Sequence, residues 1–237
     1  VIIKNARFDY RWVVGSRFIA LDSASTMQLN DIKCKPYVSY TNEEDKIYAL
    51  QLKIDKMKAQ DFINSLPIGL FHHFEGMEAQ GNFSYTLNFE YNNHKPNDII
   101  FDSKLQPEGL RITKYGEANL NKINSEFIYS AIENGKPQRA ITVGANNPYF
   151  TPLEAISPYL QKCVLTSEDP SFFEHRGFIN SAFKQSIVKN IKTKKFARGA
   201  STISMQLVKN VFLTREKTLS RKLEEILMVY ILENNRI

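Results

Sequence analysis

The chain has 237 residues, a length that suits one large domain or two small ones, and its 43% hydrophobic and 24% charged residues are ordinary values for a globular protein. These values exclude a wholly disordered chain and a collagen-like repeat. No run of about 18 apolar residues occurs, so no membrane-spanning helix is predicted within these limits. The chain begins at Val1 without Met and shows no signal peptide, and we expect it to be an internal piece of a longer protein.

Charge is unevenly distributed along the chain. Residues 1–143 carry equal numbers of basic and acidic side chains, so the net charge of +6 comes from residues 144–237. Within that half, residues 176–215 contain nine Lys or Arg and no Asp or Glu. Such a stretch either forms a solvated positive face or favours an anionic partner, such as a diphosphate, a nucleic acid or a membrane surface. The two cysteines, Cys34 and Cys163, indicate neither a disulfide framework nor a metal cluster.

The first half has the pattern of β-structure. Apolar and polar residues alternate over 82–90 and again over 48–54, which is the period of a half-buried strand. One short helix is predicted at 59–65, ending before Pro67. Shorter strands are predicted at 8–14, 17–21, 99–101, 110–113, 127–131 and 139–143.

Residues 1–143 show no compact cluster of Ser, His, Asp or Cys. His72 and His73 are adjacent but have no third ligand at a metal-binding spacing. We therefore expect a packing or spacer domain, and its alternating strands resemble the β-rich repeats of AsmA-like envelope proteins.

The pattern changes to helices near residue 144. Residues 151–154 (Thr-Pro-Leu-Glu) have the form of a capping box with Pro at the first helical position. Ser157 and Pro158 start a helix that should stop at Pro170. Apolar residues at helical spacing predict further helices at 179–191, 201–212 and 219–233, so the second half is predicted to be all-α.

Three segments of this half could do chemistry: 167–177, 198–210 and 217–225. Glu168 ends a helix beside a proline-broken aromatic loop, where a carboxylate can face a cleft, lose part of its solvation and act as a general acid or base. A Gly-Ala-Ser-Thr turn that opens a helix offers N–H groups and hydroxyls to an anion. Lys209 and the basic residues of the third segment could neutralise a leaving diphosphate. Each segment alone also has an ordinary explanation as a helix end or a solvated surface.

Together and in this order, the three segments closely resemble the peptidoglycan glycosyltransferases of family 51, the transglycosylase domain of penicillin-binding proteins. The family's motifs run Glu-Asp-x-x-Phe-x-x-His-x-Gly, then Gly-Gly-Ser-Thr-Ile-x-Gln-Gln-x-x-Lys-Asn, then Arg-Lys-x-x-Glu. The matching residues are Glu168, Asp169, Phe172, His175 and Gly177 in the first, Gly199, Ser201, Thr202, Ile203, Gln206, Lys209 and Asn210 in the second, and Arg221, Lys222 and Glu225 in the third.

Three positions depart from the family's pattern. Ala200 replaces the second Gly, and Met205 stands where the first Gln of a pair is common, which removes one hydrogen-bonding side chain. Lys217 replaces the usual Arg, so a bidentate grip on phosphate becomes a point-charge contact. The family's domain continues beyond its third motif, and the resemblance implies that residues 144–237 are the N-terminal part of a domain truncated at its C-terminus.

The implied architecture is α+β. A β-rich spacer or envelope-associated domain over 1–143 would precede an all-α, lysozyme-like glycosyltransferase domain that is truncated at the C-terminus. The implied reaction polymerises lipid II into glycan strands, with inversion at the anomeric carbon and release of polyprenyl diphosphate. Glu168 would be the general base, and Glu225 would position the sugar or assist departure of the leaving group. The implied substrate-binding residues are Asp169, His175, Gly199, Ser201, Thr202, Gln206, Lys209, Asn210, Lys217, Arg221 and Lys222.

The resemblance also implies a setting for the protein. No cofactor is required, although a divalent cation, Mg or Mn, aids the diphosphate in some members, and no metal-ligand cluster is visible in the sequence. The partners would be lipid II, the growing glycan strand and other proteins of cell-wall synthesis. The site of action would be the outer, periplasmic face of the bacterial cytoplasmic membrane, with a membrane anchor preceding Val1.

Two other functions fit parts of the same sequence. A lysozyme-like hydrolase would use one glutamate as a general acid to cleave glycan, although it does not need the basic cluster after residue 184. A non-catalytic envelope protein would use its β-rich half and keep a degenerate helical half. A nucleic-acid binder would rest on the basic stretch alone, without stacking aromatics or a recognition helix, and we expect no nucleic-acid partner.

Overall fold

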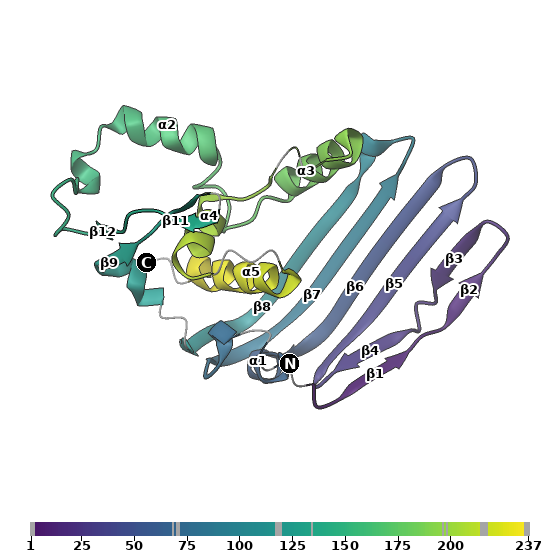
Figure 1. Ribbon diagram of the computed structural model, residues 1–237. Coiled ribbons are helices and arrows are strands. Elements are labelled where there is room, and N and C mark those ends of the chain that lie inside the picture. Colours follow the sequence, from purple (N-terminus) through teal and green to yellow (C-terminus); the bar gives the residue numbers. More distant parts are fainter. Residues whose placement is uncertain are drawn as a thin grey trace. The chain divides into compact units, whose positions relative to one another are not determined.

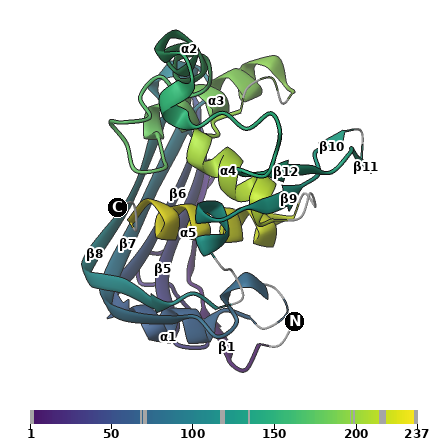
Figure 2. The same cartoon turned by 90° about the vertical axis from the view of Figure 1, so that its left-hand side faces the viewer.

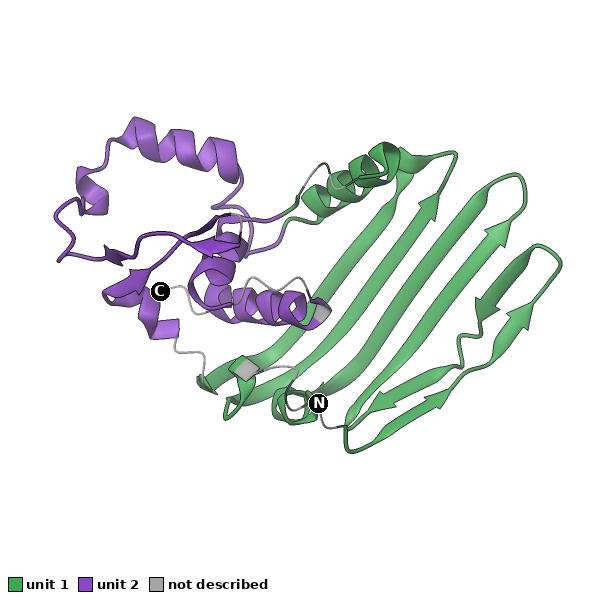
Figure 3. Ribbon diagram, viewed as in Figure 1, with its two compact units in different colours: residues 1–116, 179–200 green, residues 117–178, 201–237 purple. Residues whose placement is uncertain are grey.

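The computed structural model describes residues 3–67, 69, 72–116, 120–133, 135–195, 197, 199–213 and 218–234, with only the backbone at His72 and Leu219. The chain forms two compact units (Figure 3). Unit 1 contains residues 1–116 and 179–200, and unit 2 contains residues 117–178 and 201–237. The chain thus leaves unit 2 after residue 178 and returns to it at residue 201. The predicted domain boundary between residues 143 and 144 stays a prediction.

Unit 1 is built on one antiparallel sheet with long central strands (Figure 1). The main path of the sheet runs β1-β4-β5-β6-β7-β8, and β2 pairs with β3, which in turn pairs with β5. The strands are β1 (Ala6–Asp9), β2 (Trp12–Val14), β3 (Phe18–Leu21), β4 (Thr26–Leu29), β5 (Ile32–Asn42), β6 (Lys46–Lys58), β7 (Glu78–Asn92) and β8 (Ile100–Lys114).

Helices lie near both ends of the long strands (Figure 1). The core of unit 1 forms where α1 (Ala59–Ser65) packs on the sheet and buries Ala59 with Ala79 and Phe83. The ring of Phe62 meets that of Phe83 edge to face at 5.2 Å, an arrangement that the ring quadrupoles favour. The remaining helical elements of unit 1 are η1 (His72–Phe74), η2 (Pro96–Asp98) and α3 (Asn180–Thr193).

The predicted strands are confirmed in type but not always in extent. The strand predicted at 8–14 is split into β1 and β2, whereas those predicted at 99–101 and 110–113 belong to the single strand β8. Strand β5 was not predicted, and it contains Pro36 although proline is disfavoured in a central strand. The neighbouring strands explain why proline is tolerated there. On one side of β5, β4 pairs with it only up to Cys34, and β3 pairs with it only from Ser39. Pro36 lies in the gap between these two strands, where β5 needs no N–H donor on that side.

Among its described residues, unit 2 contains two two-stranded sheets and three α-helices. Its core is the contact of α4 (Ile203–Val211) with α5 (Leu219–Asn234), where Met205, Val208, Met228 and Val229 are almost wholly buried. Its other elements are η3 (Leu120–Asn124), β9 (Phe127–Tyr129), β10 (Ile132–Glu133), β11 (Lys136–Pro137), β12 (Ile141–Val143), η4 (Leu153–Ala155) and α2 (Pro158–Glu168). In Figure 2, α4 and α5 are seen beside the strand pair β9 and β12 of the same unit.

The helices predicted in the second half are confirmed, with one correction. Residues 151–154 do not form a capped α-helix: η4 is a single 3₁₀ turn, its N-cap is Pro152, and no side chain caps it. Proline at this cap has neither an N–H nor a side-chain acceptor, so the capping box fails. The mixed α and β content agrees with the predicted class, while the lysozyme-like all-α description stays a prediction. No helix among the described residues is both long and apolar enough to span a bilayer.

Gly81 provides a test of the sheet's register. It lies at φ +86° in an irregularity between β7 and β8, and a Cβ there would meet the carbonyl oxygen of Gly109 at 2.2 Å. We predict that Gly81→Ala lowers the free energy of unfolding by about 2–4 kcal/mol, because the strained backbone and the clash add. Gly109→Ala is the matched control, since Gly109 also has a positive φ of +61° but open space around it. Equal losses in urea denaturation for the two variants would contradict the clash.

Candidate active site

Two adjacent carboxylates at the end of α2 point into different environments. Helix α2 starts with Pro158 at its first turn and ends at Glu168, and Asp169 leaves helical geometry at φ −157° because Pro170 follows. Glu168 is exposed, whereas Asp169 is only 1% exposed. The partial desolvation predicted for Glu168 is therefore not provided by the described residues, and the buried member of the pair is Asp169.

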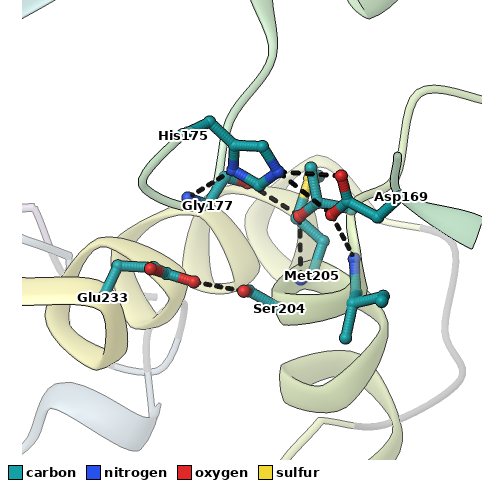
Figure 4. Close-up of polar contacts among 8 residues, drawn as sticks. Asp169, His175, Gly177, Ser204, Met205 and Glu233 are labelled. Atoms are coloured by element: carbon teal, nitrogen blue, oxygen red, sulfur yellow. Dashed lines mark hydrogen bonds and ion pairs between the residues drawn. The ribbon is translucent and has the colours of Figure 1, made fainter. Parts of the chain in front are cut away.

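The carboxylate of Asp169 is held by hydrogen bonds from two parts of the chain (Figure 4). His175 Nε2 lies 2.9 and 3.0 Å from its two oxygens, and the backbone N–H of Ile203 donates to Oδ2 at 3.1 Å. The other ring nitrogen of His175, Nδ1, accepts from the N–H of Gly177 at 3.0 Å. Because Nδ1 accepts, the ring hydrogen resides on Nε2 and the hydrogen bond to Asp169 is donated by His175.

Gly177 allows the loop to approach α5 closely. Its φ is +82°, and a Cβ at this position would lie 2.5 Å from Val229 Cγ1 and 2.9 Å from Glu233 Cγ. The carbonyl of Gly177 accepts from Thr202 Oγ1 at 2.8 Å. A glycine is required here for both reasons, backbone conformation and space.

Thr202 caps the start of α4. Its Oγ1 accepts from the N–H of Met205 at 3.2 Å, which is the usual N-cap bond, while the Ile203 N–H is taken by Asp169. Sequence reasoning expected this turn to present its N–H groups to an anion. Two of these N–H groups, those of Ile203 and Met205, already donate to side chains of the protein and are not free for an anion.

Gln206 brings the exposed carboxylate to the outer face of α4. Its Nε2 donates to Glu168 Oε2 at 2.9 Å. Lys209 and Asn210 follow at i+3 and i+4, so they lie on the same face of the helix as Gln206, and all three are half-buried. The structure thus brings together Glu168, Gln206 and the Lys209 side of α4.

The inner face of α4 holds a buried polar pair that sequence reasoning missed. Ser204 Oγ donates to Glu233 Oε1, and both residues are about 3% exposed (Figure 4). The contact joins the start of α4 to the end of α5. The burial of Glu233 could have been predicted from the sequence, because it lies four residues after the apolar Val229 and therefore shares the same helix face.

Glu225 lies near the start of α5 and is ion-paired on both oxygens. Arg221 Nη1 is 2.8 Å from Oε2 and Lys222 Nζ is 2.5 Å from Oε1, and the Glu225 side chain is only 2% exposed. The described geometry therefore makes Glu225 a buried anchor that orients two cations. On the same helix, burial raises the pKa of the Tyr230 hydroxyl.

The remaining predicted site residues take no part in the contacts described above. Ser201 is exposed where the chain returns to unit 2, and Gly199, with open space around it, belongs to unit 1. Lys217 lies outside the described residues. Within the described part of the chain, no group of three His, Cys, Asp or Glu residues is placed to hold a metal ion.

The Asp169 network predicts a large stability effect from an isosteric change. In Asp169→Asn, an NH₂ donor replaces one of the two acceptor oxygens that face the N–H groups of His175 and Ile203. A buried donor is then left unsatisfied, and we expect a loss of about 1–3 kcal/mol in the free energy of unfolding. The neighbouring change Glu168→Gln, at an exposed carboxylate, should stay within about 0.5 kcal/mol of the parent. Chemical denaturation of both variants measures the difference, and equal effects would show that Asp169 does not hold the loop to α4.

Comparison with known proteins identifies the family that this part of the chain matches. Residues 134–236 match the family model described as Transglycosylase. The biosynthetic peptidoglycan transglycosylase of Nitrosospira multiformis is 37% identical over 113 residues, which are 48% of this chain and 48% of that protein. The protein of the same name from Nitrosomonas eutropha is 49% identical over 80 residues, or 34% of this chain and 33% of the relative.

A longer relative matches in the same way. Penicillin-binding protein 4 of Bacillus subtilis is 33% identical over 115 residues, which are 48% of this chain and 18% of that protein. The chain spans about half the length, or less, of the curated relatives it matches. Residues 134–236, which contain Glu168, the Asp169 network and the α4–α5 pair, thus form a segment that matches the transglycosylase family.

Proposed function

We propose that this chain is part of a peptidoglycan glycosyltransferase, which polymerises lipid II into glycan strands with inversion at the anomeric carbon and release of polyprenyl diphosphate. The observation that carries the proposal is the arrangement along α4. An exposed carboxylate, Glu168, is held by Gln206, and the ammonium-bearing Lys209 lies one turn further along the same helix face. The family match of residues 134–236 supports the same reaction.

In the proposed reaction Glu168 acts as the general base. It removes the proton from the 4-hydroxyl of the acceptor sugar, and the resulting oxygen attacks the anomeric carbon of the donor. The bond from that carbon to the lipid diphosphate breaks on the opposite side, so the electron pair leaves with the diphosphate and the configuration inverts. The hydrogen bond from Gln206 Nε2 to Oε2 supports this role, because it fixes the carboxylate in one orientation.

Positive charge would stabilise the diphosphate as it leaves. Lys209, one turn after Gln206 on α4, is one candidate for this charge. Arg221 and Lys222 are two more, and the buried Glu225 holds both in place. Arg221 Nε is buried and donates to none of the described residues. We place Lys217 in the same group, and we assign Glu225 to orienting the cations and, through them, the departing group.

Asp169, His175 and Thr202 act in the proposal as positioning residues. Their hydrogen bonds join the loop after α2 to the start of α4, and so they fix the distance between Glu168 and Gln206. Ser201 and Asn210 of unit 2 would line the substrate cleft, and Gly199 is kept as a predicted substrate-binding residue.

The wider setting is part of the same proposal. The catalytic part, in a lysozyme-like domain that continues beyond this chain, would act at the outer face of the bacterial cytoplasmic membrane with partners of cell-wall synthesis. The β-rich part would be an AsmA-like spacer or envelope-associated module. No cofactor is required in this mechanism, and a Mg or Mn ion that binds the diphosphate would add to the charge supplied by the lysines.

The direct test is Glu168→Gln in the full-length protein. We expect polymerisation of lipid II to fall by at least about a thousandfold, while binding of lipid II and the thermal midpoint stay unchanged. Polymer length on gels and release of polyprenyl diphosphate measure the reaction. Full activity in this variant would remove Glu168 from its role. Release of muropeptides from finished glycan would favour the hydrolase instead.

Charge on α4 can be tested separately. Lys209→Glu should lower kcat/KM for lipid II by about tenfold to a hundredfold, because it places a negative charge beside the departing diphosphate. Lys162→Glu, an equal charge change on the exposed face of α2, should leave the rate within about twofold. A similar loss in both variants would indicate general electrostatic attraction to an anionic surface and not a contact at the diphosphate.

A further inference from the structure

The sheet of unit 1 ends on one side in a long strand. Strand β8 is the last strand of the main path, and each of its 15 residues is exposed or half-buried (Figure 1). On the other side the outermost strands, β1 and β2, have only four and three residues. Short edge strands protect a sheet from pairing with other chains, whereas a long exposed one presents a row of N–H and C=O groups. Within the described residues, β8 pairs only with β7.

Only the first half of β8 is suited to accept a further strand. Pro107 has no N–H to donate, and Gly109, at φ +61°, lies beside an irregularity in the β7–β8 register. Residues 100–106 pair with residues 84–90 of β7 without a break. This segment is about 20 Å long, at about 3.4 Å per residue, and it is the part of the edge where a new ladder of hydrogen bonds could form.

The segment carries two opposite charges on one face. Asp102 and Lys104 are both exposed, and because they are two residues apart in a strand they lie on the same side of the sheet. The residues directly across from them on β7 are the uncharged Asn88 and Thr86. The neighbouring strand therefore supplies no countercharge opposite either group, and a strand on the open side could supply one for each.

A second copy of β8 fits this edge in one register. A two-fold axis perpendicular to the sheet passes beside a residue that faces its own copy, and it keeps the two faces of both sheets aligned. With the axis at Asp102 or at Lys104, like charges would face each other. With the axis at Ser103, Asp102 of each copy faces Lys104 of the other, and Phe101 faces Leu105 on the opposite side of the sheet. Ser103 is also the midpoint of residues 100–106, so this register pairs the whole segment.

We propose that two copies of this chain associate through β8, antiparallel, with Ser103 of each copy beside the two-fold axis. The pairing joins two eight-stranded sheets into one, and because both copies use the same edge the assembly closes as a dimer. An extended segment of another protein would satisfy the backbone equally well, but the self-complementary order of Asp102 and Lys104 favours a second copy. One strand pair is a small interface, so we expect a dissociation constant of roughly micromolar size.

The first experiment exchanges the two charges. Sedimentation equilibrium of the purified chain should show monomer and dimer in a concentration-dependent balance. Asp102→Lys and Lys104→Asp each place like charges opposite each other at two positions, and each should raise the dissociation constant by about tenfold or more. The double variant Asp102→Lys/Lys104→Asp restores opposite charges in the same register, and its dissociation constant should return to within about threefold of the parent's.

Two further variants serve as controls. Lys33→Asp, an equal charge change at an exposed lysine of β5, should leave the dissociation constant within about twofold. Glu168→Gln should dimerise like the parent, so a failure of the proposed enzymatic reaction would not alter this result. A parent that stays monomeric, or a double variant that is no better than the single ones, would overturn the proposal. So would growth beyond a dimer, which indicates pairing between two different edges.

The second experiment tests the register. Directly opposed residues of an antiparallel pair have Cα atoms about 4.5–5.5 Å apart, which is within disulfide range. Ser103→Cys should therefore form a covalent dimer when copper phenanthroline oxidises the two thiols, in a Cys163→Ser background because Cys163 is exposed. Ser84→Cys, on the neighbouring strand β7, is the control and should stay monomeric on a non-reducing gel.

The cysteine variant has a folding control of its own. Ser103 Oγ lies 2.9 Å from Tyr85 Oη, so the thermal midpoint of Ser103→Cys is measured beside the cross-linking. A variant that keeps the parent's midpoint but does not cross-link, or equal cross-linking at both positions, would overturn the register. If the midpoint falls, the charge exchange decides, because Asp102 and Lys104 are exposed.

Discussion

The local structure of unit 2 depends on the buried carboxylate of Asp169. A carboxylate that is 1% exposed is stable only when its oxygens are hydrogen-bonded, and here His175 and the Ile203 N–H supply the donors. Those donors come from the loop after α2 and from the first turn of α4. One charged group therefore sets the spacing between two segments that are 34 residues apart in the chain. The exposed neighbour, Glu168, gains a fixed position without being buried itself.

The α4–α5 pair extends this arrangement. The inner face of α4 is anchored by Met205, Val208 and the Ser204–Glu233 hydrogen bond, so the helix cannot rotate. Its outer face then presents Gln206 and Lys209 in a fixed order. A packed apolar interface thus decides which polar side chains lie on the outer face of α4, and the charges in the proposed mechanism would need little reorganisation when the diphosphate leaves.

The two units use basic residues in different ways. In unit 2, Arg221 and Lys222 are paired with the buried Glu225, which orients them. In unit 1, Lys184 and Lys189 line a pocket of about 390 Å³ in which none of the described lining residues is acidic. The first arrangement suits a precise contact with a reacting anion.

The sequence by itself determined the class of each element and the identity of the candidate residues, because these depend on local periodicity, on proline and on fixed motif spacing. It predicted the end of α2 at Pro170 and the helical spacing of α5. It did not reveal that Asp169 rather than Glu168 is buried, that Glu233 pairs with Ser204, or that β5 tolerates Pro36. Only the tertiary structure decided these points, since burial and hydrogen-bond partners come from segments distant in the chain. The alignment of Val38, Leu50 and Phe89 across β5, β6 and β7 is of the same kind, because strand register sets it and no single strand contains it.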